Sequence, residues 1–282
     1  MKKKSLAIAA LILSSLSPLL SADEHTNDAV WRAVHDNSHR TQDDKQRDRY
    51  RHPEAVLKFF NIQNNSVVAE VAPGTGWYTR ILAPLVKDEG KYIGLNHDPD
   101  FYAKRFPDNK EWADRLRSYP ERLKEEPELY GSKAVGSWIP ITGKLPVEQA
   151  SVDVVFISRT LHNWQNQGRI EEGLQQSWQI LKPKGVLAIV QHRMADSYKG
   201  TREDAAKKGR FVESDLIALV EEQGFKLVEK SEINANPKDT ADYEKGVWTL
   251  PPSLAMKDEN RTHYLEIGES DRMTLKFVKI KA

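Results

Sequence analysis

The apolar positions of the chain alternate between short continuous runs and helical spacings. Continuous runs of this length are typical of buried strands. They cover residues 67–72, 92–96, 151–158 and 186–190, and the mixed segments 225–233 and 273–280 look like two more strands. Between two of these runs, one helix face carries Ile170, Leu174, Trp178 and Leu181 at spacings of four, four and three. Strands that alternate with helices in this way predict an α/β fold, with a mostly parallel sheet that helices cover on both faces.

The last two predicted strands, 225–233 and 273–280, interrupt this alternation. A long connection joins them without an obvious helix, so we expect them to pair antiparallel at one edge of the sheet. The complete prediction is a doubly wound, mostly parallel sheet of seven strands with an antiparallel C-terminal edge strand.

The first 22 residues have the pattern of an export signal. Three lysines precede an apolar stretch over residues 6–20, and the small residues Ser21 and Ala22 come before Asp23. The stretch is short for a bilayer span, which needs about 20 apolar residues. We therefore predict a signal peptide over 1–22 and an exported protein, periplasmic in a Gram-negative host, without stable membrane insertion after cleavage. An uncleaved N-terminal anchor is the alternative. Residues 23–60 are predicted to form a helical arm and residues 61–282 the main domain.

Composition narrows the class of partner. The 282 residues contain 42 Lys and Arg against 41 Asp and Glu, without a long basic run, which disfavours a nucleic-acid binder. A mean hydropathy of −0.63 excludes a polytopic membrane protein. Cysteine is absent, so disulfides, thiol nucleophiles and thiolate metal sites are excluded. A small molecule is the expected partner.

The turn after the first predicted strand carries the clearest chemistry. Glu70 lies near the strand end, and Gly74 and Gly76 precede a helix. Glycines allow a ligand to approach the backbone, and a helix start offers free N–H groups. A dinucleotide-binding turn needs a third glycine where Thr79 stands, and a phosphate-binding loop needs a Gly-Lys pair that is missing. The turn fits a cofactor with an amino-acid tail and no pyrophosphate. A plain strand–helix turn that binds nothing is the alternative.

Several stretches together resemble a known family. The run VVAEVAPGTGWYT at 67–79 resembles motif I of the class I S-adenosylmethionine (SAM)-dependent methyltransferases, and residues 92–96, 145–164 and 181–193 resemble later motifs in the same order. The resemblance covers roughly residues 50–280. It implies a Rossmann-like fold and S-adenosyl-L-methionine as cofactor. The segment 47–53 and the closing Asp-Arg-Met narrow the resemblance to a bacterial group of predicted methyltransferases that often carry signal peptides.

The same resemblance assigns the site residues. The methionine part of SAM would lie among Glu70, Ala72, Gly74 and Gly76, with Tyr78 as a wall of the pocket and Asn96 at the ribose. The methyl-transfer side would be lined by Asp153 and residues 158–162. The chain departs from the family pattern at Ala72, which replaces a glycine, and at Asn96 and Gln191, which stand in place of acids. The third strand, near residues 135–139, also lacks the usual acidic residue near the adenine.

Methyl transfer from a sulfonium depends mainly on positioning, because the methyl group is already activated. His162 is the candidate general base, with a structural histidine as the alternative, and Asp153 is the second catalytic candidate, with a role as cap or turn partner as its alternative. The adjacent His97, Asp98 and Asp100 cannot converge on a metal without a special turn, so no metal site is predicted.

The predicted function is an exported SAM-dependent methyltransferase that acts on an unidentified small molecule. The alternative is a non-catalytic ligand-binding protein on a methyltransferase scaffold, since SAM is made in the cytoplasm. The loop at 246–253, with a tryptophan and two prolines, is either a lid over the acceptor or a plug at the sheet edge.

Overall fold

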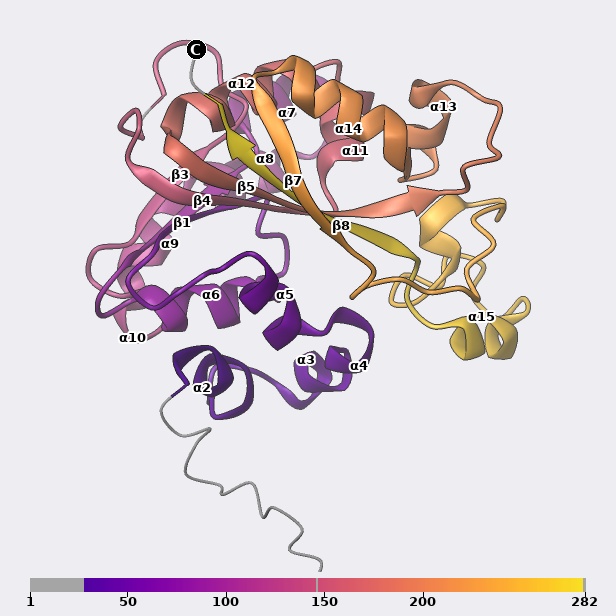
Figure 1. Ribbon diagram of the computed structural model, residues 1–282, viewed down its shortest axis with the longest axis horizontal. Coiled ribbons are helices and arrows are strands. Elements are labelled where there is room, and N and C mark those ends of the chain that lie inside the picture. The colour runs from indigo at the N-terminus through magenta and orange to yellow at the C-terminus, as the bar shows by residue number, and fades with distance from the viewer. Residues whose placement is uncertain (1–27, 146, 281–282) are drawn as a thin grey trace, which may run out of the picture.

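A twisted, eight-stranded sheet forms the centre of the molecule (Figure 1). The computed structural model describes residues 28–145 and 147–280, so the predicted signal peptide lies outside the described residues. The strands are β1 (Val67–Val71), β2 (Lys91–Asn96), β3 (Val135–Trp138), β4 (Val152–Ser158), β5 (Leu181–Met194), β6 (Phe211–Val212), β7 (Phe225–Ser231) and β8 (Arg272–Lys279). Their order is β3-β2-β1-β4-β5-β8-β7, with the two-residue β6 beside β5.

The strand pairing confirms the predicted fold class and corrects the prediction that the C-terminal strand lies at the edge of the sheet. The strands β1 to β5 run parallel, with Val68 opposite both Tyr92 of β2 and Val154 of β4. The antiparallel strand is β8, but it lies between β5 and β7 instead of at the edge, where β7 stands. This inner place fits β8 because Met273, Leu275 and Phe277 are completely buried.

Helices cover both faces of the sheet. On one face the apolar side chains of α11 (Leu161–Asn166), α12 (Ile170–Ile180) and α14 (Glu213–Glu222) join one core cluster. On the other face lie α2 (Ala29–His35), α5 (Pro53–Phe59), α6 (Thr79–Val86) and α9 (Tyr119–Glu125) with a second cluster. Figure 1 shows these two layers above and below the sheet. The remaining helices are α3 (Gln42–Gln46), α4 (Asp48–Arg51), α7 (Pro99–Arg105), α8 (Lys110–Arg117), α10 (Pro127–Tyr130), α13 (Arg202–Lys207) and α15 (Arg261–Ile267). Among the described residues, none of the helices is long and apolar enough to cross a bilayer.

The N-terminal helices hold the segment that follows β1. Thr41 and Asp44 form a capping box that starts α3. The Asp44 carboxylate also accepts two hydrogen bonds of 2.7 Å from Arg80 of α6, and its backbone oxygen accepts one of 3.0 Å from Trp77 Nε1. The arm thereby fixes the turn between β1 and α6. The domain boundary near residue 60 stays a prediction.

The connection between β7 and β8 contains helices that the sequence pattern did not indicate. A short 3-10 helix, η1 (Gly246–Thr249), precedes α15. Gly246 adopts φ +56°, and a Cβ there would lie 2.4 Å from the Lys208 oxygen, so only glycine fits. This packing places Trp248 and the following prolines beside the carboxyl ends of the parallel strands.

Candidate functional site

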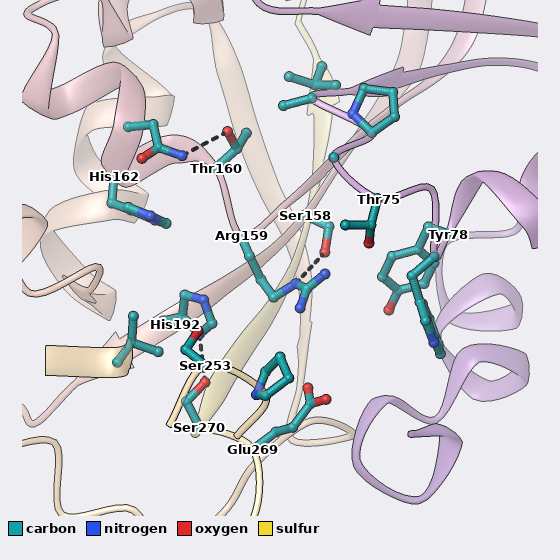
Figure 2. A pocket seen from close by; sticks show the side chains of 18 of the residues that line it. Thr75, Tyr78, Ser158, Arg159, Thr160, His162, His192, Ser253, Glu269 and Ser270 are labelled. Carbon is teal, nitrogen blue, oxygen red and sulfur yellow. Dashed lines mark hydrogen bonds between the residues drawn. The ribbon is translucent and has the colours of Figure 1, made fainter. Parts of the chain in front are cut away.

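Two cavities open at the carboxyl edge of the parallel strands, one on each side of the turn after β1. The first has a volume of about 340 Å³ and is called the histidine cavity because His162 and His192 line it (Figure 2). The second has a volume of about 600 Å³ and is called the tyrosine cavity after Tyr119 and Tyr130. Both cavities share Gly74 and its neighbours in the turn, so a ligand bound to the turn has access to both. This edge is where open α/β sheets bind ligands.

The turn, residues 72–78 and here called the glycine loop, is shaped to receive a ligand. Its Ala72 and Gly74 both adopt left-handed backbone conformations, with φ of +49° and +61°. A Cβ at Gly74 would meet only one atom within 4 Å, the Ala72 oxygen at 3.8 Å, so the space beside it is open. Among the described residues, the amides of Thr75, Trp77 and Tyr78 find no hydrogen-bond acceptor. The loop therefore offers free donors around an open space.

Glu70, near the end of β1, links the start of α6 to β2 through hydrogen bonds. It is buried, and its carboxyl accepts hydrogen bonds of 2.7 Å from Thr79 Oγ1 and from the Tyr92 hydroxyl. Burial raises the pKa of Glu70 to about 7, an effect that these two donors oppose only in part. Glu70 borders the histidine cavity, as the resemblance implied, but its hydrogen bonds go to the protein.

The raised pKa makes the stability of the fold depend on pH. A carboxyl with a folded pKa of about 7 and an ordinary value of 4.5 stabilises the fold fully below pH 4.5 and loses that contribution as the pH rises through 7. We therefore compare the free energy of unfolding of Glu70→Gln with that of wild type at two pH values. The difference should favour the variant by about 3 kcal/mol more at pH 8 than at pH 5. Urea denaturation at both pH values measures it, with the exposed Glu121→Gln as control. An identical pH dependence in wild type and Glu70→Gln would contradict this role.

Asn96 lies at the end of β2 and lines the tyrosine cavity. Its Oδ1 accepts a 2.9 Å hydrogen bond from the His97 amide, which leaves the NH₂ group to a ligand. The nearby Asp98 caps α7 and lies 3.5 Å from Arg169, so it does not replace the missing acid. Asn96 therefore presents a neutral donor where the family pattern has a charged acceptor.

His162 begins α11 and points into the histidine cavity (Figure 2). Burial lowers its pKa to about 4, with a further contribution from the Arg159 charge, so the ring is neutral at pH 7. Gln191 Nε2 lies 3.1 Å from the Gly209 oxygen and 3.3 Å from His162 Nδ1. Since Gln191 must donate to Gly209, it also donates to Nδ1, and the ring proton is on Nε2. His162 thus presents an N–H donor, which disfavours the predicted role of general base.

The catalytic prediction for Asp153 is corrected. It lies at the amino end of β4, opposite the cavities, because Ser158 is the residue at the carboxyl end. Its carboxylate accepts a 2.9 Å hydrogen bond from the Val67 amide and lies 2.7 Å from Lys182 Nζ. Asp153 therefore has a structural role that links the starts of β1 and β5, which is neither the predicted catalytic role nor the alternative role of cap or turn partner. Tyr78 is buried against Phe156 and also borders the histidine cavity.

The structure singles out Arg159 within the predicted stretch 158–162 and adds Glu269, which the sequence analysis did not name. The Arg159 side chain reaches the middle of the histidine cavity (Figure 2) from a left-handed backbone, with φ of +57°. Glu269 lies at the cavity floor, where it pairs with Arg47, Arg51 and Arg272 at 2.7, 2.9 and 3.2 Å. Arg47 and Arg51 lie more than 200 residues before Glu269 in the chain. The sequence therefore indicated this cluster only through the motifs at 47–53 and 271–273.

Part of the chain is similar to known proteins in sequence, and its fold is similar to solved structures. Residues 69–189 match the model of a family described as a methyltransferase domain. The fold is similar to a SAM-dependent methyltransferase from Aquifex aeolicus, with a TM-score of 0.52, 18% identity, and coverage of 84% of this chain and 95% of that chain. It is also similar to a protein described as the [4+2]-cyclase SpnF, with a TM-score of 0.54, 14% identity and coverage of 87% and 86%. The search of curated proteins found no match.

The glycine loop fits the cofactor that such a domain uses. The open space at Gly74, the free amides beside it and the donor of Asn96 lie between two cavities, which suits an extended ligand with an amino-acid end and a nucleoside end. Residues 69–189 therefore resemble a methyltransferase domain in sequence, the fold is similar to that of a SAM-dependent methyltransferase, and the glycine loop offers the open space and the donors that S-adenosyl-L-methionine would need.

Proposed function

We propose that the chain is an exported enzyme that transfers a methyl group from SAM to a small molecule. The observation that carries the proposal is the division of the site by the glycine loop. The tyrosine cavity is the larger one and presents Asn96. The histidine cavity is smaller and is closed on one side by Trp248, Pro251 and Pro252. A volume of about 340 Å³ has the size of a small-molecule site.

The residues of the chain divide the work between them. Bound SAM supplies a methyl group that its sulfonium already activates. The glycine loop binds and orients the cofactor through backbone donors, and the loop with Trp248 excludes water. The neutral His162 ring orients the acceptor with its Nε2–H. Its ring centroid lies 5.8 Å from that of Trp248. Positioning rather than proton removal is the expected contribution of this site.

Export is the second part of the proposal, and the leader pattern of residues 1–22 supports it. Expression of the full chain in a Gram-negative host, followed by fractionation and N-terminal mass analysis, tests it. We expect a periplasmic protein that begins at Asp23. A cytoplasmic protein that retains the lysines at positions 2–4 would refute export and leave the methyltransferase assignment intact.

The competing function is that of a non-catalytic ligand-binding protein on the same scaffold. The similar fold of the cyclase SpnF favours keeping this alternative, because it shows that the fold also occurs in a protein described by another activity. Incubation with methyl-labelled SAM and a small-molecule extract separates the two functions. The proposed enzyme releases S-adenosylhomocysteine and labels a small molecule, and His162→Ala slows this release. Binding of SAM without any labelled product would favour the ligand-binding protein.

Asn96 provides a test of where the cofactor binds. We expect Asn96→Asp to bind S-adenosylhomocysteine about fivefold more tightly, because a carboxylate accepts a stronger hydrogen bond from a hydroxyl than an amide can make. Calorimetric titration measures the affinity, and the exposed Asn109→Asp should leave it unchanged. Equal affinity of wild type and Asn96→Asp would place the ribose elsewhere.

A further inference from the structure

The guanidinium of Arg159 is available to a ligand. It lines the histidine cavity, and its one hydrogen bond to a described residue runs from Nε to Ser158 Oγ, at 3.3 Å. Among the described residues, no carboxylate lies within the 4 Å of an ion pair with it. Burial lowers the pKa of Arg159 to about 10, which still leaves the side chain charged at pH 7. A charged group in such a position needs a partner.

The surroundings of Arg159 carry more positive than negative charge. The charged group that acts most strongly on Arg159 is the carboxylate of Glu269, but that carboxylate is already paired with Arg47, Arg51 and Arg272. Both Arg51 and Glu269 are almost completely buried, so water screens this cluster weakly. Glu70 is the next carboxyl, but its raised pKa leaves it only partly ionised. The cluster therefore lacks negative charge.

Unused hydrogen-bond donors point to the same deficit. Arg47 Nη2, Arg51 Nη1 and the Tyr78 hydroxyl are buried and have no partner among the described residues. Tyr78 is 3% exposed and faces the cavity (Figure 2). Buried donors of this kind are rare in folded proteins unless a ligand or water satisfies them. An anionic group between Arg159 and Tyr78 would supply both the missing charge and an acceptor.

The opposite wall of the histidine cavity is apolar and stiff. It consists of Trp248, Pro251 and Pro252, and the rings of His162 and His192 complete it. Burial lowers the pKa of both histidines, so they add no charge at pH 7. The cavity thus combines the guanidinium of Arg159 with a wall that suits a flat apolar group.

We propose that the methyl acceptor is a small carboxylate with a flat apolar body, and that Arg159 binds its carboxylate. The inference rests on the proposed function. A guanidinium binds a carboxylate through two parallel hydrogen bonds, which a neutral amide cannot reproduce. The left-handed backbone of Arg159 is strained for a residue with a side chain. Strain of this kind is typical of functional sites.

Benzoate and its neutral analogue benzamide are suitable probes. Calorimetry would titrate each into the purified protein, with and without saturating S-adenosylhomocysteine. We expect benzoate to bind at least tenfold more tightly than benzamide, and this preference to vanish in Arg159→Gln. Arg159→Gly is the second variant, because glycine suits the left-handed backbone and keeps the fold safe. The exposed Arg117→Gln is the control for loss of charge and should behave like wild type.

Two outcomes overturn the inference. Equal binding of benzoate to wild type and both Arg159 variants would show that Arg159 holds no acceptor carboxylate. Competition between benzoate and S-adenosylhomocysteine, together with weaker binding of S-adenosylhomocysteine to the Arg159 variants, would assign Arg159 to the methionine carboxylate of the cofactor. Failure of the wild type to bind S-adenosylhomocysteine would refute the proposed function. The titrations of benzoate and benzamide in the absence of S-adenosylhomocysteine would still decide whether Arg159 selects an anion.

Discussion

Gly74→Asp should weaken cofactor binding about a hundredfold while the protein stays folded. Aspartate enters the left-handed region more readily than most residues, so the φ of +61° at this position is tolerated. Its side chain would fill the open space beside the glycine loop, where a Cβ has one neighbour within 4 Å. Its carboxylate would also compete for the free amides that the cofactor needs.

The expected loss is about a hundredfold in affinity for S-adenosylhomocysteine, which corresponds to about 3 kcal/mol. Calorimetric titration measures the affinity, and circular dichroism checks the fold. Gly168→Asp is a matched control, because Gly168 also has a left-handed φ of +67° and no atom within 4 Å of its Cβ, and it lies outside both cavities. If Gly74→Asp bound S-adenosylhomocysteine as wild type does, the cofactor would not lie on the glycine loop.

The sequence predicted the sheet because its strands carry their own signal. Buried parallel strands such as β1 and β4 are apolar on both faces, so continuous runs reveal them without any knowledge of their neighbours. The place of β8 could not be predicted in this way. Its insertion between β5 and β7 depends on which strand accepts its edge, and this pairing leaves no periodic trace in the chain.

The cofactor contacts that the resemblance assigns to the glycine loop stay predictions. The loop is one local segment, and the structure shows that its residues border the two cavities. The predicted catalytic role of Asp153 was wrong, because only the carboxyl end of the strand faces the cavities. The sequence pattern alone did not show that Asp153 lies at the other end. The proton position on His162 depends on Gln191 and Gly209, which lie on other elements. Contacts between segments decide such details.

Glu269→Gln should destabilise the fold strongly. Glu269 is 4% exposed and is the one carboxylate that the described structure pairs with Arg47, Arg51 and Arg272. Burial opposes its ionisation, but the three guanidiniums together with Arg159 outweigh burial and hold the pKa of Glu269 at about 2. Removal of one partner from a buried ion cluster costs about 3–5 kcal/mol, because the remaining charges lose their compensation.

Urea denaturation at pH 7 measures this loss, and its pH dependence identifies the cause. The folded pKa of Glu269 is lowered from 4.5, so its contribution is fully present above pH 4.5 and disappears as the pH falls through about 2. Wild type and Glu269→Gln should therefore converge in acid. Glu121→Gln, which removes an exposed pair with Lys124, should cost less than about 1 kcal/mol at any pH. If Glu269→Gln cost no more than Glu121→Gln at pH 7, the guanidiniums would not depend on Glu269, and the charge deficit beneath the histidine cavity would have to be compensated by another group.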